Sequence, residues 1–220
     1  MSTPDADGPL VVVGDELAMP TERRLILAAE RLFAERGIDA VSLRAIMAAA
    51  GTNIASVHYH FGSKESLVRA LIMTRSDEVS ARRAGLLDEL IAPGALTAEG
   101  LARAFVVPVA EMAGSDGSSW VRFIGGIMAT SHPALATLAE GFTQQAVRFT
   151  GLMERLHPDW SAGKVRFRLA QAMKLTFNVL GDLQAAQELQ QLTTAALSRD
   201  EVVEQLLDLV ATILSDPARA

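Results

Sequence analysis

Beyond residue 67, hydrophobic residues recur at the spacing of amphipathic helices, and no sustained alternation of period 2 predicts a strand. Prolines and glycines break this pattern at helix-length intervals. Pro108 lies inside one predicted helix and should kink or interrupt it, because proline has no backbone N–H to donate. We therefore expect an all-α fold. The predicted helices cover residues of about 64–91, 97–113, 120–129, 133–156, 161–188 and 198–214.

Residues 42–67 have the hydrophobic spacing of two short helices around a tight turn. In the first helix, Leu43, Ile46 and Met47 recur at helical spacing. Gly51 then offers the positive φ that ends a helix. This arrangement is typical of a helix-turn-helix, whose second helix enters the major groove of duplex DNA. An apolar stripe on that second helix consists of Ile54, Val57 and Phe61.

The predicted second helix presents a polar and aromatic face away from its apolar stripe. At about 100° per residue, this face holds Ala55, Ser56, Tyr59 and His60, with His58 on its flank. Small residues followed by aromatic and imidazole donors suit the major groove, which is about 12 Å wide. A packing role for a partly exposed aromatic end is the simpler alternative. A metal site is disfavoured, because imidazoles two positions apart on a helix face apart and the chain has no cysteine.

Residues 21–67 have particular residue types at particular positions. In these residue types and positions the segment resembles the DNA-binding domain of the TetR family of transcriptional regulators. The family usually has tyrosine where His58 stands, whereas this chain has Tyr59 one position later. Thr52 also replaces a residue that is commonly apolar in the family. The matching residues are Leu25, Ile26, Ala28, Ala29, Leu32, Phe33, Gly37, Ser42, Ile46, Ala50, Gly51, Val57, His60, Phe61, Ser63, Lys64, Glu65 and Leu67.

The resemblance implies a role for each position of the DNA-reading surface. Base or groove contacts would come from Ala55, Ser56 and His60, while His58 and Tyr59 would divide phosphate and base contact. A lysine at the start of the next helix would reach a phosphate, because free N–H groups and the helix dipole favour an anion there. Residues at the starts of the first two helices often contact the DNA backbone in the family, and caps or solvated charges explain them equally well. The predicted DNA-contacting residues are Thr21, Ser42, Arg44, Asn53, Ala55, Ser56, His58, Tyr59, His60 and Lys64.

Charge is distributed unevenly along the 220 residues, whose net charge is −6. Residues 21–69 carry seven Lys or Arg and five Asp or Glu, a net charge of +2, whereas residues 1–20 and 70–220 each carry −4. A mildly basic head on an acidic body attracts phosphate on one surface only, so DNA binding should weaken as salt rises. We expect a flexible arm over 1–20, a DNA-binding domain over 21–67 and a helical effector-binding and dimerisation domain over 68–220.

Several protein classes lack support in the sequence. The absence of cysteine excludes disulfides, thiolate metal sites and a cysteine nucleophile, which suits a reducing cytoplasm. The acidic start of the chain lacks the basic region of a signal peptide, and no window of about 18 uncharged apolar residues predicts a membrane span. No Ser/His/Asp set, phosphate-binding glycine loop or carboxylate–histidine ligand pattern indicates an enzyme. We expect a cytoplasmic protein without catalytic activity, cofactor or metal.

The last two predicted helices are apolar over more than one face, so each needs partners on more than one side. Pairing both helices with their copies in a second subunit, as an isologous four-helix bundle, would satisfy that need and is how the family dimerises. Two-fold symmetry then predicts a palindromic operator with half-sites about 34 to 36 Å apart. A monomeric core is the alternative. The apolar residues are Leu169, Met173, Leu175, Leu180, Leu183, Val202, Val203, Leu206, Leu207, Val210 and Ile213.

The central helices are the candidates for a small-molecule cavity. Aromatic and methionine side chains at helical spacing are commonly plain core, but their number, Pro108 and the pair Gly125-Gly126 favour a cavity. Polar side chains set among them, such as Arg122, Asn178, His132 and Lys174, also have ordinary surface or backbone-bonding explanations. An apolar cavity with few polar groups would favour a mostly hydrophobic ligand. The predicted ligand-binding residues are Phe105, Val109, Met112, Trp120, Arg122, Phe123, Ile127, Phe149, Met173, Phe177 and Asn178, and Phe142, Met128 and Met153 share the pattern.

These expectations combine into a dimeric repressor that a small ligand releases from its DNA operator. Ligand binding would move the connecting helix at 64–91, so that the two reading heads no longer fit consecutive grooves. One alternative is a DNA-binding protein of chromosome organisation or cell division that has no effector. A second alternative is a helical enzyme or carrier that merely contains the reading-head fold.

Overall fold

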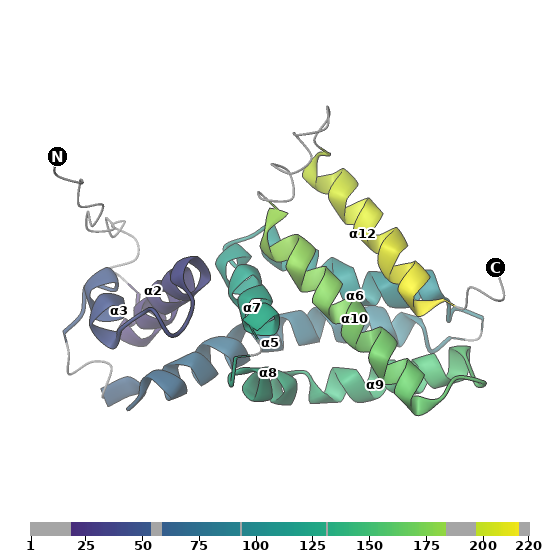
Figure 1. The fold of residues 1–220 in the computed structure, drawn as a ribbon, viewed down its shortest axis with the longest axis horizontal. Coiled ribbons are helices and arrows are strands. Elements are labelled where there is room, and N and C mark those ends of the chain that lie inside the picture. The colour runs from purple at the N-terminus through teal and green to yellow at the C-terminus, as the bar shows by residue number, and fades with distance from the viewer. Residues whose placement is uncertain (1–18, 54–58, 93, 131, 184–196, 216–220) are drawn as a thin grey trace. The chain divides into compact units, whose positions relative to one another are not determined.

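The computed structural model describes residues 19–53, 59–92, 94–130, 132–183 and 197–215, and every regular element within these ranges is an α-helix (Figure 1). This confirms the predicted all-α fold class. No described helix is long and apolar enough to cross a membrane. The helices are α2 (Thr21–Arg36), α3 (Leu43–Ala49), α5 (Lys64–Glu89), α6 (Ala98–Ala113), α7 (Ser118–Thr130), α8 (Leu135–Gly141), α9 (Thr143–Leu156), α10 (Ala162–Gly181) and α12 (Arg199–Leu214).

The chain divides into two compact units, Met1–Leu71 and Ile72–Ala220, and the division falls inside α5. In the first unit, α2 packs against α3. Gly51 has a φ of 60°, which confirms the left-handed turn predicted after α3. The buried side chains of this unit include Leu25, Leu32, Phe33, Ile46, Met47, Leu67 and Leu71.

The second unit is built around α10, which packs against α6, α7, α9 and α12 (Figure 1). Two glycines allow α7 and α10 to approach closely. A Cβ at Gly125 would lie 3.1 Å from the Phe177 carbonyl oxygen, and one at Gly181 would lie 3.2 Å from the Arg122 Cα. Gly125 does not line a cavity, contrary to the prediction, because its missing side chain makes room for a neighbouring helix.

The structure contains a helix break that the hydrophobic pattern did not reveal. The helix expected over 133–156 is two helices, α8 and α9, which meet at Phe142. This residue has φ −108° and ψ 8°, and its ring is buried. Glycine at position 141 weakens the helix locally, so turning the chain to bury the aromatic ring is favoured over continuing it. The helix expected over 161–188 likewise ends earlier, since α10 stops at Gly181.

Of the two expected effects of Pro108, a kink or an interruption, the interruption does not occur, because α6 continues through this residue. In an uninterrupted helix, the carbonyl of Ala104 would accept a hydrogen bond from the N–H of residue 108, which proline lacks. Arg83 of α5 supplies the missing donor, because its Nε donates to the Ala104 carbonyl oxygen at 3.1 Å. A side chain from another helix therefore satisfies the acceptor that proline leaves open.

Candidate functional site

The exposed face after the α3 turn carries two aromatic side chains. Tyr59 is 86% exposed, and its ring meets the His60 ring edge-on with centroids 5.1 Å apart. Both residues are helical and both point into solvent. A large aromatic side chain left this exposed gains nothing from burial, so it is available to contact a partner. The predicted contacts of Ala55, Ser56 and His58 fall outside the described residues.

The first turn of α5 favours negative charge. The Ser63 hydroxyl accepts a hydrogen bond from the backbone N–H of Ser66 at 3.1 Å. The backbone N–H of Glu65 and the Ser63 hydroxyl lower the pKa of the Glu65 carboxyl. Lys64 stands at the first position of the helix, and its Nζ lies 5.9 Å from the centroid of the Phe33 ring. The N–H groups of this turn are thus already paired with Ser63 and Glu65, and a phosphate contact by Lys64 stays a prediction.

The other four residues predicted to contact DNA lie at helix starts or on the surface. Ser42 caps α3, since its hydroxyl accepts from the Ala45 N–H at 3.2 Å. Thr21 is the half-buried first residue of α2, and Pro20 rather than a hydroxyl residue precedes it. Arg44 and Asn53 are exposed. The structural role of Ser42 is thus visible, and DNA contact by these four residues stays a prediction.

The second unit contains a partly open cavity of about 250 Å³ between α5, α6, α9 and α10. One face of α10 forms its longest wall, because the α10 residues that line it are spaced so that they share one side of the helix. The wall is mainly apolar, and aromatic rings dominate it. The lining residues are Arg83, Phe105, Phe142, Gln145, Ala146, Phe149, Thr150, Arg166, Leu169, Ala170, Met173 and Phe177.

Four of the predicted ligand-binding residues line this cavity, namely Phe105, Phe149, Met173 and Phe177. The other seven do not. Five of these are buried in the helical core: Val109, Met112, Trp120, Phe123 and Ile127. The two polar ones are exposed: Arg122, whose Nε donates to the Gly181 carbonyl oxygen at 3.2 Å, and Asn178.

Arg83 is the cavity residue of most chemical interest, and the sequence analysis missed it. Its side chain is buried, with 4% exposed. Burial lowers the pKa of its guanidinium to about 10, which leaves it charged near neutral pH. The guanidinium lies over three aromatic rings, 5.3 Å from the centroid of Phe105, 5.5 Å from Phe142 and 5.8 Å from Phe149. The only signal in the sequence was Pro108, which predicts an open carbonyl without revealing the donor.

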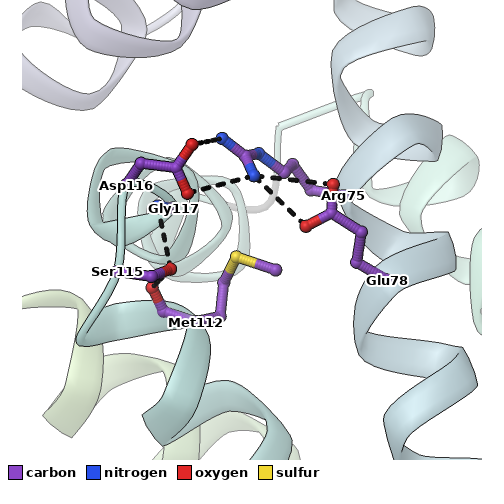
Figure 2. A network of polar contacts seen from close by, with 6 residues as sticks. All are labelled: Arg75, Glu78, Met112, Ser115, Asp116 and Gly117. Atoms are coloured by element: carbon purple, nitrogen blue, oxygen red, sulfur yellow. Dashed lines mark hydrogen bonds and ion pairs between the residues drawn. The ribbon is translucent and has the colours of Figure 1, made fainter.

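A second arginine of α5 is buried in a different environment (Figure 2). Arg75, 7% exposed, forms an ion pair with Asp116 in the turn between α6 and α7, with Nη2 and Oδ2 3.1 Å apart. Its Nη1 also lies 3.2 Å from the Glu78 carboxylate one turn further along α5. The hydroxyl of Ser115 orders the same turn by donating to the Met112 carbonyl oxygen at 2.9 Å. This group ties α5 to the turn that precedes α7.

The apolar residues predicted to form a dimer face lie in three environments. In α12, Val202, Leu206 and Val210 are buried inside the unit, where α12 packs against α6 and α10. Leu169 and Met173 of α10 line the cavity. Leu180 is buried, and the remaining predicted residues are partly exposed, namely Leu175, Leu183, Val203, Leu207 and Ile213. Two large apolar side chains outside the prediction are more exposed, Phe167 (64% exposed) on α10 and Leu209 (54% exposed) on α12.

Comparison with protein families matches both units. Residues 25–71 match the N-terminal sequence model of the bacterial regulatory proteins of the TetR family. Residues 103–212, half of the chain, match a tetracycline-repressor-like C-terminal domain. These two matches fall within the two units into which the structure divides, Met1–Leu71 and Ile72–Ala220.

Curated relatives are similar mainly over the DNA-binding segment. The HTH-type transcriptional regulator UidR of Escherichia coli K12 is 34% identical over 65 residues, which are 30% of this chain and 33% of UidR. The HTH-type transcriptional repressor KstR2 of Mycolicibacterium smegmatis is 33% identical over 81 residues, 36% of this chain and 40% of KstR2. The matched segments thus span two fifths or less of these relatives.

Solved structures are similar over almost the whole chain. The ketosteroid transcriptional regulator KstR2 of Mycobacterium tuberculosis aligns over 88% of this chain and 94% of its own, with a TM-score of 0.59 and 22% identity. A regulatory protein of the TetR family from Rhodococcus RHA1 aligns over 90% of this chain and 100% of its own, with a TM-score of 0.65 and 17% identity. At these identities the likeness concerns the fold alone. The two family matches identify the chain as a member of the TetR family and a DNA-binding transcriptional regulator, not an enzyme.

Proposed function

We propose that this chain is a cytoplasmic, homodimeric repressor that a small, mostly hydrophobic ligand releases from a palindromic operator. One observation carries the proposal: a single helix, α5, contains Lys64 at the end of the DNA-binding segment and Arg83 in the cavity wall. A ligand that displaces the second half of α5 would therefore act on the same helix that begins at the reading head. A protein without an effector has no need for such a cavity.

Ligand release requires a difference in affinity between two states. A ligand can shift the protein off DNA only as far as it binds the off-DNA state more tightly than the DNA-bound state. We expect the mostly aromatic cavity wall to favour hydrophobic compounds. Repression is the proposed sign of regulation, since KstR2 of Mycolicibacterium smegmatis is a repressor.

The proposed dimer uses α10 and α12. Phe167 and Leu209 are large apolar side chains left exposed on these helices, and contact with a second copy would bury them. An isologous pairing would present two reading heads with two-fold symmetry, as a palindromic operator requires.

The central test is a fluorescence anisotropy titration with the operator, which is first selected from a random DNA pool with the full-length protein. A palindromic selected sequence is expected for a two-fold dimer. Operator affinity is then measured with and without saturating candidate ligand. An unchanged affinity at saturation would eliminate release by that ligand, and selection of no sequence would contradict operator binding.

The reading surface has its own prediction. Substituting Tyr59 and Lys64 with alanine should abolish operator binding, because this removes an exposed aromatic contact and a cation at the start of α5. The same double substitution should leave the circular dichroism spectrum and the dimer mass unchanged. Operator binding that persists at low salt would show that neither side chain contacts DNA.

A further inference from the structure

We infer that the cavity selects an anionic amphiphile: a small hydrophobic carboxylate whose charged group pairs with Arg83 and whose apolar part packs on the aromatic wall. This inference rests on the proposed function of the cavity as the effector site. It goes further by naming the chemical class of the ligand and the residue that recognises it.

The guanidinium of Arg83 has donors to spare. Arginine carries five N–H donors. Nε donates to the Ala104 carbonyl oxygen at 3.1 Å, and Nη2 donates to the Phe105 carbonyl oxygen at 3.2 Å. Among the described residues, no other hydrogen bond or ion pair of Arg83 occurs, so the remaining three N–H groups lack an acceptor there. Nη1 is not among the fully buried polar atoms that lack a partner, so it is accessible from the cavity, where a ligand oxygen could accept its hydrogen bonds.

Pro108 accounts for the Nε bond but not for the charge. The carbonyl that Pro108 leaves open needs one neutral donor, which an uncharged side chain could supply. A buried arginine with only carbonyl partners costs more free energy than a neutral donor would, because burial disfavours the charged form. The charge becomes useful when an anion enters the cavity, because ion pairing is strongest where water is excluded.

The rest of the lining agrees with a negatively charged ligand. The cavity wall includes no Asp or Glu among its described residues. Its other charged residue is Arg166, an exposed cation that forms no hydrogen bond or ion pair with the described chain. Gln145 and Thr150 add neutral polar groups. Two cations without a carboxylate around an apolar space match a ligand with one charged end and one hydrophobic end.

The size of the cavity restricts the ligand further. A volume of about 250 Å³ lies just below the range of typical ligand pockets, which runs from about 300 to 1,000 Å³. Phe105, Phe149 and Phe177 supply flat apolar surfaces. A medium-length aliphatic acid or a single-ring aryl acid fits these limits.

The experiment compares matched acids and amides by isothermal titration calorimetry on the full-length protein. The probes are octanoate against octanamide and 4-phenylbutyrate against 4-phenylbutanamide, which share their apolar parts within each pair. We expect each carboxylate to bind about tenfold or more tightly than its amide, as hydrogen bonds to a charged group allow. Equal affinities within both pairs, or no binding by either carboxylate, would overturn the inference.

Variants then assign the preference to Arg83. Arg83→Met should reduce the acid-over-amide ratio to about twofold or less, since it removes the charge and retains much of the volume. Because Arg83→Met also leaves the Ala104 carbonyl open, the same substitution is made in a Pro108→Ala background, where residue 108 can donate to that carbonyl. Arg82→Met is the matched control, because Arg82 is adjacent in sequence and lies outside the cavity lining. A ratio that survives Arg83→Met in the folded Pro108→Ala protein contradicts the assignment.

A parallel anisotropy titration separates this inference from the proposed function. If octanoate binds through Arg83 but leaves operator affinity unchanged, the ligand class stands and release by that ligand fails. If only neutral hydrophobic compounds bind and release the operator, release stands and the ligand class is wrong.

Discussion

The two buried arginines of α5 occupy opposite environments on one helix. Arg75 faces two carboxylates, Asp116 and Glu78, and ties α5 to the turn before α7 (Figure 2). Arg83, two turns further along, faces two backbone carbonyls, three aromatic rings and an open cavity. One guanidinium has its charge neutralised within the protein, and the other does not.

This difference indicates that the charge of Arg75 stabilises the fold, whereas the charge of Arg83 is available to a ligand. A carboxylate beside a buried cation supplies the acceptors that water would otherwise provide. Arg75 therefore needs nothing from outside the protein. Arg83 keeps its charge without a carboxylate beside it, so its pairing is incomplete until an anion arrives. Substitutions of Arg83, Asp116 and Arg82, with Pro108→Ala as a control background, test this contrast.

Arg83→Met should have the largest effect on stability, a loss of about 2 kcal/mol in the free energy of unfolding, because it leaves a buried carbonyl without a donor. The loss is partly offset because a buried charge also disappears. Urea denaturation monitored by circular dichroism measures the change. An increase in stability would mean that the two carbonyl bonds contribute less than the charge costs.

Pro108→Ala is the control that identifies the cause. With an alanine N–H available for the Ala104 carbonyl, Arg83→Met should cost less than about 1 kcal/mol. If Arg83→Met lowers the free energy of unfolding equally in both backgrounds, the open carbonyl is not the cause. The lost contacts with the aromatic rings would then explain the destabilisation.

Asp116→Ala should have an intermediate effect, a loss of about 1 kcal/mol, because Asp116 itself is mostly solvated and Arg75 retains Glu78. Thermal or urea denaturation measures it. At 0.5 M NaCl, where the screening length is roughly 4 Å, the cost of Asp116→Ala should shrink while that of Arg83→Met should not. Equal salt dependence of both variants would contradict the contrast between a paired and an unpaired arginine.

Arg82→Met should have the smallest effect, with no measurable change in the denaturation midpoint. Arg82 also connects α5 to α6, through Glu111, with Nε and Oε2 2.9 Å apart, but both side chains are half exposed. An exposed ion pair gains little because water solvates both charges when they are separate. A clear destabilisation would show that any arginine bridging these helices matters, whatever its burial.

Much of the fold could be predicted from the sequence, because local patterns carried it. Apolar spacing and the glycine at 51 located α3 and its turn, and the same spacing placed α5, α6 and α12 close to their observed bounds. The sequence pattern did not predict the break at Phe142, because the residues before and after it continue one amphipathic pattern. Only the burial of the Phe142 ring marks the break.

For the cavity, the sequence alone determined that aromatic and methionine residues recur in the central helices, and Phe105, Phe149, Met173 and Phe177 do line it. Only the tertiary structure decided which aromatic faces border empty space and which, like Trp120, are packed in the core. It alone also brought Arg83 of α5 to the carbonyl that Pro108 leaves open in α6. Periodicity reports which side of a helix is apolar, whereas the partner of a charged side chain depends on how helices distant in the sequence pack together.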